Sequence, residues 1–263
     1  MAAGRQRGGG RRTGGTARRR VAAALALAAV AAVAAGAVVA AGSRDRSPEG
    51  DPGGGAPLDV AVVGDSLIEQ SRDPLAAHAT RAGLTIETWA FGGSAPCDWM
   101  DRFRALAADP PRHLVISFAG NDSTPCVNPG GGPPRDPRTI ADAYAEDVPE
   151  ILDLFAGTGT DLYVALPPPV GEPASEPAAA AIRAMYRDVV AARPEVTLVD
   201  PAPLLGPDGR FRRALPCEAW EASACGADGT VAVREADGIH FTPAGGERYA
   251  RVLLAAIGEP VPR

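Results

Sequence analysis

From Leu58 onward, short apolar runs alternate with stretches whose apolar residues recur every three or four positions. The first pattern is typical of buried strands and the second of helices with one buried face. Strands are predicted at residues 59–63, 85–91, 113–119, 162–166 and 196–199, and helices at 71–82, 139–155, 176–192 and 243–257. This alternation favours an α/β fold in which helices cover both faces of a central parallel sheet.

Two of the predicted helices carry signals for their shape and ends. Pro149 lies inside the helix at 139–155, where it predicts a kink. The last helix has Thr242 as its N-cap and Pro243 at its first position, and Gly258 ends it. Ligands of parallel sheets bind beyond the carboxyl ends of the strands. Functional residues are therefore expected directly after each strand.

The first 42 residues have a different pattern. Residues 1–20 contain seven Arg, and residues 21–42 are uncharged and almost wholly apolar. A helix of that length would span roughly 33 Å, close to the ~30 Å core of a bilayer. Because the basic block precedes the apolar one, residues 1–20 are predicted to be a cytoplasmic tail and residues 21–42 a transmembrane signal anchor.

A cleaved signal peptide is the alternative interpretation of this segment. Val39-Ala40-Ala41 resembles a small-residue cleavage site, and Arg18-Arg19 before an apolar run is compatible with twin-arginine export. Both interpretations place the rest of the chain outside the cytoplasm, either on the cell membrane as a single-pass protein or secreted. Residues 43–57 then form a flexible linker, and residues 58–263 form one domain.

Charge is distributed unevenly between these parts. The formal net charge is −6 overall, of which residues 1–57 contribute nine Arg against three acids (+6) and the remainder 17 Arg against 29 acids (−12). An acidic domain argues against nucleic acid as a partner, because phosphates require a basic surface.

The four cysteines form two pairs that are close in the sequence. Cys97 with Cys126, and Cys217 with Cys225, are the expected disulfides in an oxidising compartment. Four cysteines allow three connectivities, and four free thiols are the other alternative. Metal binding is not expected, because no CxxC occurs and no His lies near a Cys.

The first predicted strand ends in Gly64-Asp65-Ser66-Leu67. A Ser at a tight strand-to-helix turn can hold its hydroxyl clear of the sheet, where the helix N-terminus favours an anion. The motif differs from the G-x-S-x-G elbow, since Ile68 follows two residues after the Ser. A turn in which Asp65 or Ser66 only caps the helix is the alternative.

The second and third strands end in further turn motifs. Gly92-Gly93 lets backbone N–H groups approach a ligand, and the amide of Asn121 could donate a hydrogen bond to an oxyanion. Each motif alone is also compatible with an ordinary turn.

Asp237 and His240 precede the last helix. An Asp three residues before a His can bind the imidazole Nδ1, which leaves Nε2 free to accept a hydroxyl proton. A surface pair without a catalytic role is the alternative. His78 and His113 have no such neighbours and are interpreted as structural.

Together these four motifs resemble those of the SGNH (GDSL-type) hydrolase family. Its blocks carry a Ser, a Gly, an Asn and a His, which match Ser66, Gly93, Asn121 and His240, with Asp237 as the Asp of the last block. The resemblance spans residues 64–240. It implies a flavodoxin-like three-layer α/β/α fold and an acyl-enzyme on the nucleophile, with no metal or organic cofactor.

The resemblance also implies an oxyanion hole formed by the backbone N–H groups of Ser66 and Gly93 and the side chain of Asn121. Gly92 could take the place of its neighbour. The cysteines just beyond the Gly and Asn blocks resemble those of exported members that act on cell-envelope glycans. Pocket walls are expected from residues 98–100 and 125–137.

The expected function is an exported, monomeric serine esterase or acyltransferase, acting on short-chain or O-acetyl esters of a cell-envelope glycan or a lipid. A catalytically silent SGNH-type glycan-binding domain is one alternative. A carrier domain is another, because Asp65-Ser66-Leu67 matches the site that receives a phosphopantetheine arm. Carriers are small helical domains, whereas here the motif follows an apolar strand.

Overall fold

Five parallel strands form the central sheet of the computed structural model, which describes residues 57–132 and 136–259. Their order is β2-β1-β3-β4-β5. Every residue of β1 and β3 is buried, whereas β2 lies at an edge and is largely half-buried. The strands are β1 (Val60–Gly64), β2 (Ile86–Ala90), β3 (His113–Ser117), β4 (Asp161–Ala165) and β5 (Val196–Val199).

The strand order reverses at β1, which has β2 on one side and β3 on the other. Val60 is in register with both Ile86 and His113, so the carboxyl ends of the three strands lie at the same level. Such a reversal opens a crevice at the carboxyl edge of a doubly wound sheet. The loops that leave β1, β2 and β3 are those predicted to carry the site.

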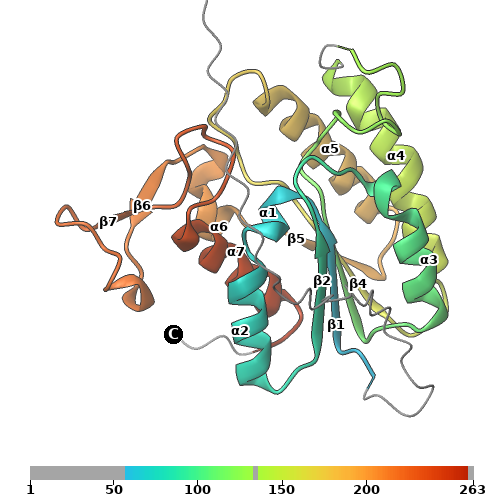
Figure 1. The fold of residues 1–263 in the computed structure, drawn as a ribbon, viewed down its shortest axis with the longest axis horizontal. Coiled ribbons are helices and arrows are strands. Elements are labelled where there is room, and N and C mark those ends of the chain that lie inside the picture. Colours follow the sequence, from blue (N-terminus) through green and yellow to red (C-terminus); the bar gives the residue numbers. More distant parts are fainter. Residues whose placement is uncertain (1–56, 133–135, 260–263) are drawn as a thin grey trace, which may run out of the picture. The chain divides into compact units, whose positions relative to one another are not determined.

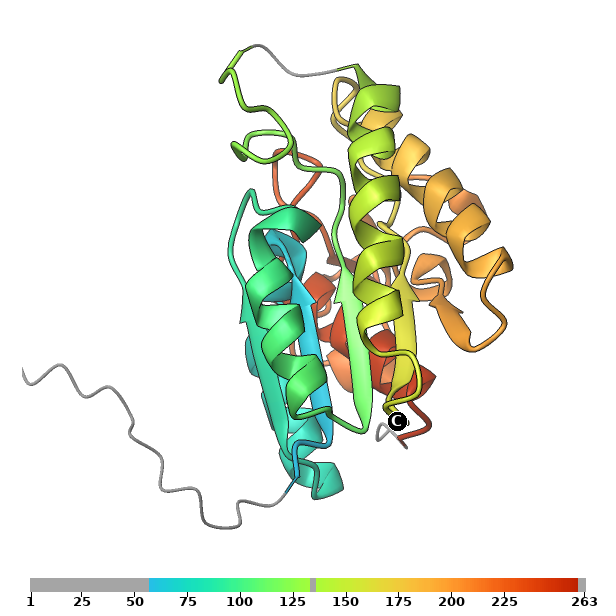
Figure 2. The same cartoon turned by 90° about the vertical axis from the view of Figure 1, so that its right-hand side faces the viewer.

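Helices cover both faces of the sheet, as Figures 1 and 2 show. One core packs α3, α4 and α5 against the sheet, and a second packs α1, α2 and α7 against the opposite face. The predicted three-layer α/β/α architecture is therefore confirmed. The helices are α1 (Ser66–Glu69), α2 (Arg72–Ala82), α3 (Met100–Ala108), α4 (Pro137–Leu154), α5 (Glu176–Ala191) and α7 (Pro243–Ala256).

A less regular segment connects β5 to α7. It contains a two-stranded antiparallel sheet, which packs beside α7 rather than joining the main sheet. A buried ion pair between Glu221 and Arg248 of α7 holds the segment in place. Its elements are α6 (Ala202–Leu205), η2 (Pro207–Gly209), β6 (Ala214–Pro216), η3 (Ala219–Glu221) and β7 (Thr230–Ala232).

The predicted strands agree with the structure to within one or two residues, and the predicted helices agree similarly. The sequence analysis missed α1, α3, α6 and the β6–β7 sheet, and it also missed the 3-10 turns η1 (Pro96–Trp99), η2 and η3. Pro149 lies inside α4, which runs through it as one helix. No helix within residues 57–132 and 136–259 is long and apolar enough to cross a bilayer. The predicted anchor at 21–42 lies outside the described residues.

Candidate active site

Ser66 is the first residue of α1, directly beyond the end of β1. The turn requires glycine at position 64, because a Cβ there would collide with the carbonyl oxygen of Ser117 and the side chain of Ile68. Asp65 caps the helix by accepting a hydrogen bond from Leu67 N at 3.0 Å. Adjacent backbone packing therefore fixes where the Ser66 hydroxyl emerges.

Asp65 does more than cap this short helix. Its Oδ2 accepts hydrogen bonds from Ala119 N at 2.7 Å and from Asn121 Nδ2 at 3.0 Å. The side chain is 1 % exposed, and burial raises the pKa of Asp65 to about 6 against the opposing effect of these N–H donors. Asp65 thus joins the nucleophile turn to the loop that follows β3, a connection that the sequence analysis did not identify.

Asp237 and His240 lie on a tight turn before α7. Asp237 Oδ2 accepts a 2.6 Å hydrogen bond from His240 Nδ1, and its Oδ1 accepts from the backbone N–H groups of Ile239 and His240. Partial burial opposes ionisation, but these hydrogen bonds outweigh it and lower the pKa of Asp237 to about 2. The carboxylate is therefore ionised at neutral pH.

The structure brings this pair to the nucleophile. His240 Nε2 lies 3.1 Å from Ser66 Oγ, across 174 residues of sequence. Because the N–H of Nδ1 donates a hydrogen bond to Asp237, Nε2 is the nitrogen that can accept the Ser66 proton. The arrangement has the geometry of a Ser-His-Asp triad in which the His is a general base.

Arg234 supports the turn that carries Asp237 and His240, and the sequence analysis did not identify it. Its guanidinium donates to the carbonyl oxygens of Ile239, at 2.8 Å, and Pro169, at 3.3 Å, and lies 4.4 Å from the ring centroid of Phe241. Arg234 is 1 % exposed, and among the described residues it has no carboxylate partner and its Nε has no hydrogen bond. Burial lowers its pKa to about 10. No local pattern marks such a residue, because its partners lie on two separate loops.

The loops after β2 and β3 carry the expected oxyanion donors. Asn121 Nδ2 donates to Asp65 Oδ2 and, at 3.1 Å, to the carbonyl oxygen of Ser94. Both amide hydrogens are therefore engaged in this structure, and a bound oxyanion would have to share one of them. The shared hydrogen would come from a side chain that is already held rigidly in place.

Gly92 and Gly93 lie between β2 and this network. Gly93 has φ +82°, in the left-handed region that favours glycine. A Cβ on Gly92 would lie 3.7 Å from Ser66 Cβ, so the Gly92 backbone passes beside the nucleophile. The contacts leave both glycines as candidates for the second N–H donor.

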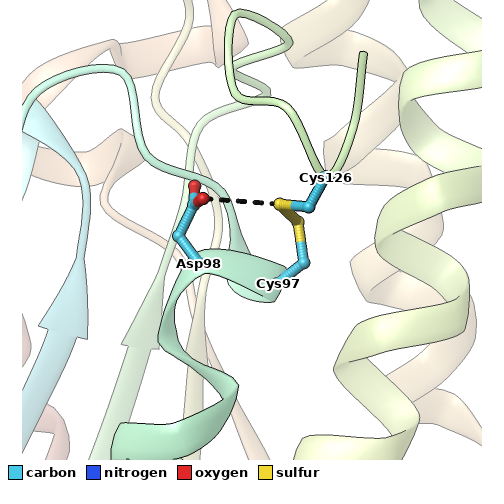
Figure 3. Close-up of side chains that lie close together, drawn as sticks. All are labelled: Cys97, Asp98 and Cys126. Carbon is cyan, nitrogen blue, oxygen red and sulfur yellow. Dashed lines mark hydrogen bonds between the residues drawn. A yellow bond between two sulfur atoms is a disulfide. The ribbon is translucent and has the colours of Figure 1, made fainter. Parts of the chain in front are cut away.

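The Cys97–Cys126 disulfide links the loops after β2 and β3, and Cys217–Cys225 closes the second predicted pair. Asp98 accepts a hydrogen bond from Thr124 at 2.6 Å across the first link. Figure 3 shows Asp98 beside the two bonded sulfur atoms. Because both sulfurs belong to the disulfide, this group offers no thiolate ligands for a metal ion.

The remaining histidines have structural surroundings. His78 lies between Glu247 and Arg81, with contacts of 2.8 and 2.7 Å. His113 is buried beside Asp161 and Tyr163, and desolvation lowers its pKa. Neither lies among the residues that surround Ser66.

A cavity of about 300 Å³ opens beside Ser66 and His240. Its walls come from the loops after β1, β3 and β4 and from the first turns of α4 and α5. The expected walls were mostly wrong for the described residues: residues 98–100 do not line the cavity, and of residues 125–132 and 136–137 only Pro137 does. The α5 side was missed because its alanines resemble ordinary helix surface.

Comparison with known proteins agrees with this architecture. A family model described as "Protein of unknown function (DUF459)" matches residues 59–256. No curated protein is detectably similar to the chain in sequence.

Three solved structures illustrate the shared fold. A GDSL-like lipase from Bacteroides thetaiotaomicron has a TM-score of 0.51 at 15 % identity, over 76 % of this chain and 87 % of that one. An acetylxylan esterase from Geobacillus stearothermophilus, solved as a catalytic mutant, has a TM-score of 0.54 at 14 % identity, over 80 % and 99 %. A carbohydrate esterase family 3 protein from Talaromyces cellulolyticus has a TM-score of 0.50 at 16 % identity, over 76 % and 96 %. The SGNH fold expected from the four motifs is confirmed.

Proposed function

The chain belongs to the DUF459 family, and we propose that it is an exported serine hydrolase that cleaves or transfers the acyl group of an ester. The observation that carries this proposal is the contact of 3.1 Å between Ser66 Oγ and His240 Nε2, with Asp237 on the opposite ring nitrogen. The similar structures described as esterases and lipases support the same reaction class.

The reaction proceeds in two steps. His240 Nε2 accepts the Ser66 proton as Oγ attacks the ester carbonyl, and the resulting imidazolium is stabilised by Asp237. It then protonates the departing alcohol oxygen, leaving an acyl group on Ser66. Water, or an acceptor alcohol in a transferase, gives its proton to His240 and attacks the acyl-enzyme. His240 then returns that proton to Ser66 Oγ as the bond between Oγ and the acyl carbon breaks, which releases the acid or the new ester and restores Ser66.

The tetrahedral intermediates carry a negative charge on the former carbonyl oxygen. Ser66 N, the N–H of Gly93 or Gly92, and Asn121 Nδ2 are the donors that would stabilise it. The residues described can carry out each of these steps without a metal or an organic cofactor.

Export rests on the sequence of the first 42 residues and is supported by two disulfides, which are typical of oxidising compartments. We place the domain outside the cytoplasmic membrane, tethered by residues 21–42 or released if that segment is cleaved. The proposed substrates are esters of cell-envelope glycans or lipids, and the domain is expected to act as a monomer.

Labelling with a fluorophosphonate probe tests the proposal. The full-length chain, purified in detergent, should be labelled at Ser66 and should hydrolyse 4-nitrophenyl acetate in the presence of EDTA. Ser66→Ala should abolish both signals. A folded wild-type chain that neither reacts with the probe nor cleaves any ester would instead indicate a silent glycan-binding domain.

A further inference from the structure

The cavity beside Ser66 is lined mainly by apolar side chains. Nine of its sixteen lining residues are apolar, and its polar ones include Ser66, His240 and Asn121. Its aliphatic lining comes from α4, from α5 and the loop before it, and from the turn that carries His240: Ile140, Val170, Ala174, Ala178, Ala179 and Ile239.

The size of this cavity exceeds what an acetyl group needs. Its volume of about 300 Å³ is roughly ten times the ~30 Å³ that one water molecule occupies in the liquid. A methylene group takes about as much room as a water molecule, so the cavity holds on the order of ten non-hydrogen atoms. An acetyl group places only one methyl group beyond the carbonyl carbon and would leave most of the apolar wall uncovered.

The two sides of Ser66 differ in a way that assigns the halves of the ester. The cavity lies toward β3 and β4, whereas on the β2 side the chain is open, with Gly92 exposed and Phe91 half exposed. The alcohol leaves after the first step, but the acyl group stays on Ser66 until water attacks. A lined cavity suits the acyl group, which stays on Ser66, and an open surface suits the alcohol, which departs.

We propose that this cavity binds the acyl chain, and that the preferred acyl group has about six to ten carbons rather than two. This inference rests on the proposed function and names its substrate class. It replaces the short-chain expectation drawn from the sequence.

Ala178 is the residue that sets the length of the chain. It lines the cavity from the first turns of α5 and is half-buried. Its backbone lies close to the loop after β3, since a Cβ on Gly120 would lie 3.7 Å from the Ala178 carbonyl group. Leucine at position 178 adds three carbons to this wall. Ala180 lies on the same helix, is exposed and does not line the cavity, so Ala180→Leu is the matched control.

Two ester series measured on the full-length chain test the inference. In the first, 4-nitrophenyl esters vary the acyl group from two to twelve carbons; in the second, alkyl acetates vary the alcohol from methyl to hexyl. For the wild type, kcat/KM should rise roughly threefold to fourfold per methylene up to six to ten carbons, as expected for burial of each methylene, and then level off or fall.

Ala178→Leu should shift the best acyl length down by about three carbons and lower kcat/KM on the octanoate ester at least tenfold. Across the alcohol series it should keep the wild-type order of preference, and Ala180→Leu should leave every substrate within about twofold. Ala178→Val, a smaller change, should give a smaller shift in the same direction if the leucine variant does not fold.

A wild type that prefers acetate over all longer esters overturns the inference and leaves the proposed function intact. An Ala178→Leu variant that alters the order of preference in the alcohol series instead assigns the cavity to the alcohol half, which also overturns it. Absence of cleavage of every ester, with no fluorophosphonate labelling, rejects the proposed function itself.

Discussion

The nucleophile and its base are held in place by different kinds of structure. Ser66 follows the interior strand β1, whose neighbours β2 and β3 fix it through parallel backbone hydrogen bonds on both sides. His240 lies on a turn that belongs to neither the sheet nor a helix. The first position is thus secured by the fold as a whole, whereas the second depends on a few contacts made by individual residues.

Those contacts can be named. Phe241 N donates to Gln70 Oε1 at 2.8 Å, and Gly171 N donates to the carbonyl oxygen of Gly238 at 2.7 Å. Gly238 has φ +74°, and a Cβ there would lie 3.1 Å from the Gly171 backbone, so only glycine suits this crossing. Arg234 supplies further contacts, through its hydrogen bonds to the carbonyl oxygens of Ile239 and Pro169. We therefore expect single substitutions to displace His240 more easily than Ser66.

The largest effects should come from the two residues that exchange the proton. Ser66→Ala and His240→Ala should each lower kcat by roughly 10⁴–10⁶, and the double variant should be no worse, because such residues act as one unit. Asp237→Asn should cause a loss of kcat that is at least about ten times smaller, since Asp237 only orients and stabilises the imidazole. Steady-state and burst kinetics on an aryl ester measure this. Additive losses in the double variant would contradict a shared proton transfer.

The nucleophile region can be probed next through its oxyanion donors. Asn121→Ala should lower kcat by about 10²–10³, as removal of one oxyanion donor does elsewhere. An unchanged kcat would show that Asn121 donates only to Asp65 and Ser94, which accept both of its amide hydrogens here, and not to the oxyanion. Asn128→Ala, the same substitution on the same loop but at a residue that does not line the cavity, is the matched control.

Asp65 gives this region a pH dependence of its own. Its pKa of about 6 is raised by burial, so Asp65 takes up a proton as the pH falls through 6, and the protonated carboxyl group holds Ala119 N and Asn121 Nδ2 less strongly. Asp237, with a pKa of about 2, stays ionised over this range. As the pH falls through 6, kcat/KM should therefore decline, because the two hydrogen bonds that position the loop after β3 weaken.

In Asp65→Asn the decline below pH 6 should be shallower, because residue 65 no longer takes up a proton, and activity at the plateau should be reduced about tenfold or more. A pH–rate profile from pH 4 to 9 makes the measurement. Identical slopes in wild type and variant would show that protonation of Asp65 has no effect on the reaction.

The contrast between the two regions also explains what the sequence could predict. The strand ends of β1, β2 and β3 were predictable because buried parallel strands are continuous apolar runs that end at glycine, and motifs after them meet at one edge. The 3.1 Å contact between Ser66 and His240 follows from that edge together with the Asp-x-x-His spacing.

The segment between β5 and α7 was not predictable by the same route. Its structure depends on contacts that are distant in the sequence, such as Glu221 with Arg248, and its strands are only three residues long. Arg234 and the α5 wall of the cavity share this difficulty, because each acquires its role from a second loop or helix. By contrast, α3 was a missed signal, since Met100, Phe103 and Leu106 recur every three residues.

Arg234 should have an intermediate effect that distinguishes positioning from stability. Arg234→Met removes a buried charge that is costly to desolvate, but it leaves the carbonyl oxygens of Ile239 and Pro169 without that donor. These opposing effects should change the melting temperature by only about a few degrees, whereas kcat should fall roughly tenfold to a hundredfold because the backbone next to His240 is no longer held. Arg234→Lys keeps the charge but cannot reach both carbonyl groups as the guanidinium does.

Arg234→Lys should therefore still lower kcat, although it retains the positive charge. If both variants lose activity in proportion to a lowered melting temperature, Arg234 is only a structural residue.

The smallest effects should come from the disulfides, of which each region has one. Cys97–Cys126 spans 29 residues and joins the loops that carry the oxyanion donors, whereas Cys217–Cys225 spans only eight in the base region. The chain-entropy model gives about 3–4 kcal/mol for the first and about 2–3 kcal/mol for the second. Replacing both cysteines of a pair by Ser avoids leaving a free thiol.

The Cys97→Ser, Cys126→Ser variant should melt roughly 6–16 °C lower and lose severalfold in kcat, because Gly93 and Asn121 are then less firmly aimed. The Cys217→Ser, Cys225→Ser variant should melt about 4–12 °C lower with little change in kcat, since Glu221 and Arg248 still hold that segment on α7. Thermal unfolding by circular dichroism and turnover at 25 °C measure the two quantities separately. A larger loss of turnover in the second variant would mean that the β6–β7 sheet, rather than Arg234 and the turn contacts, positions His240.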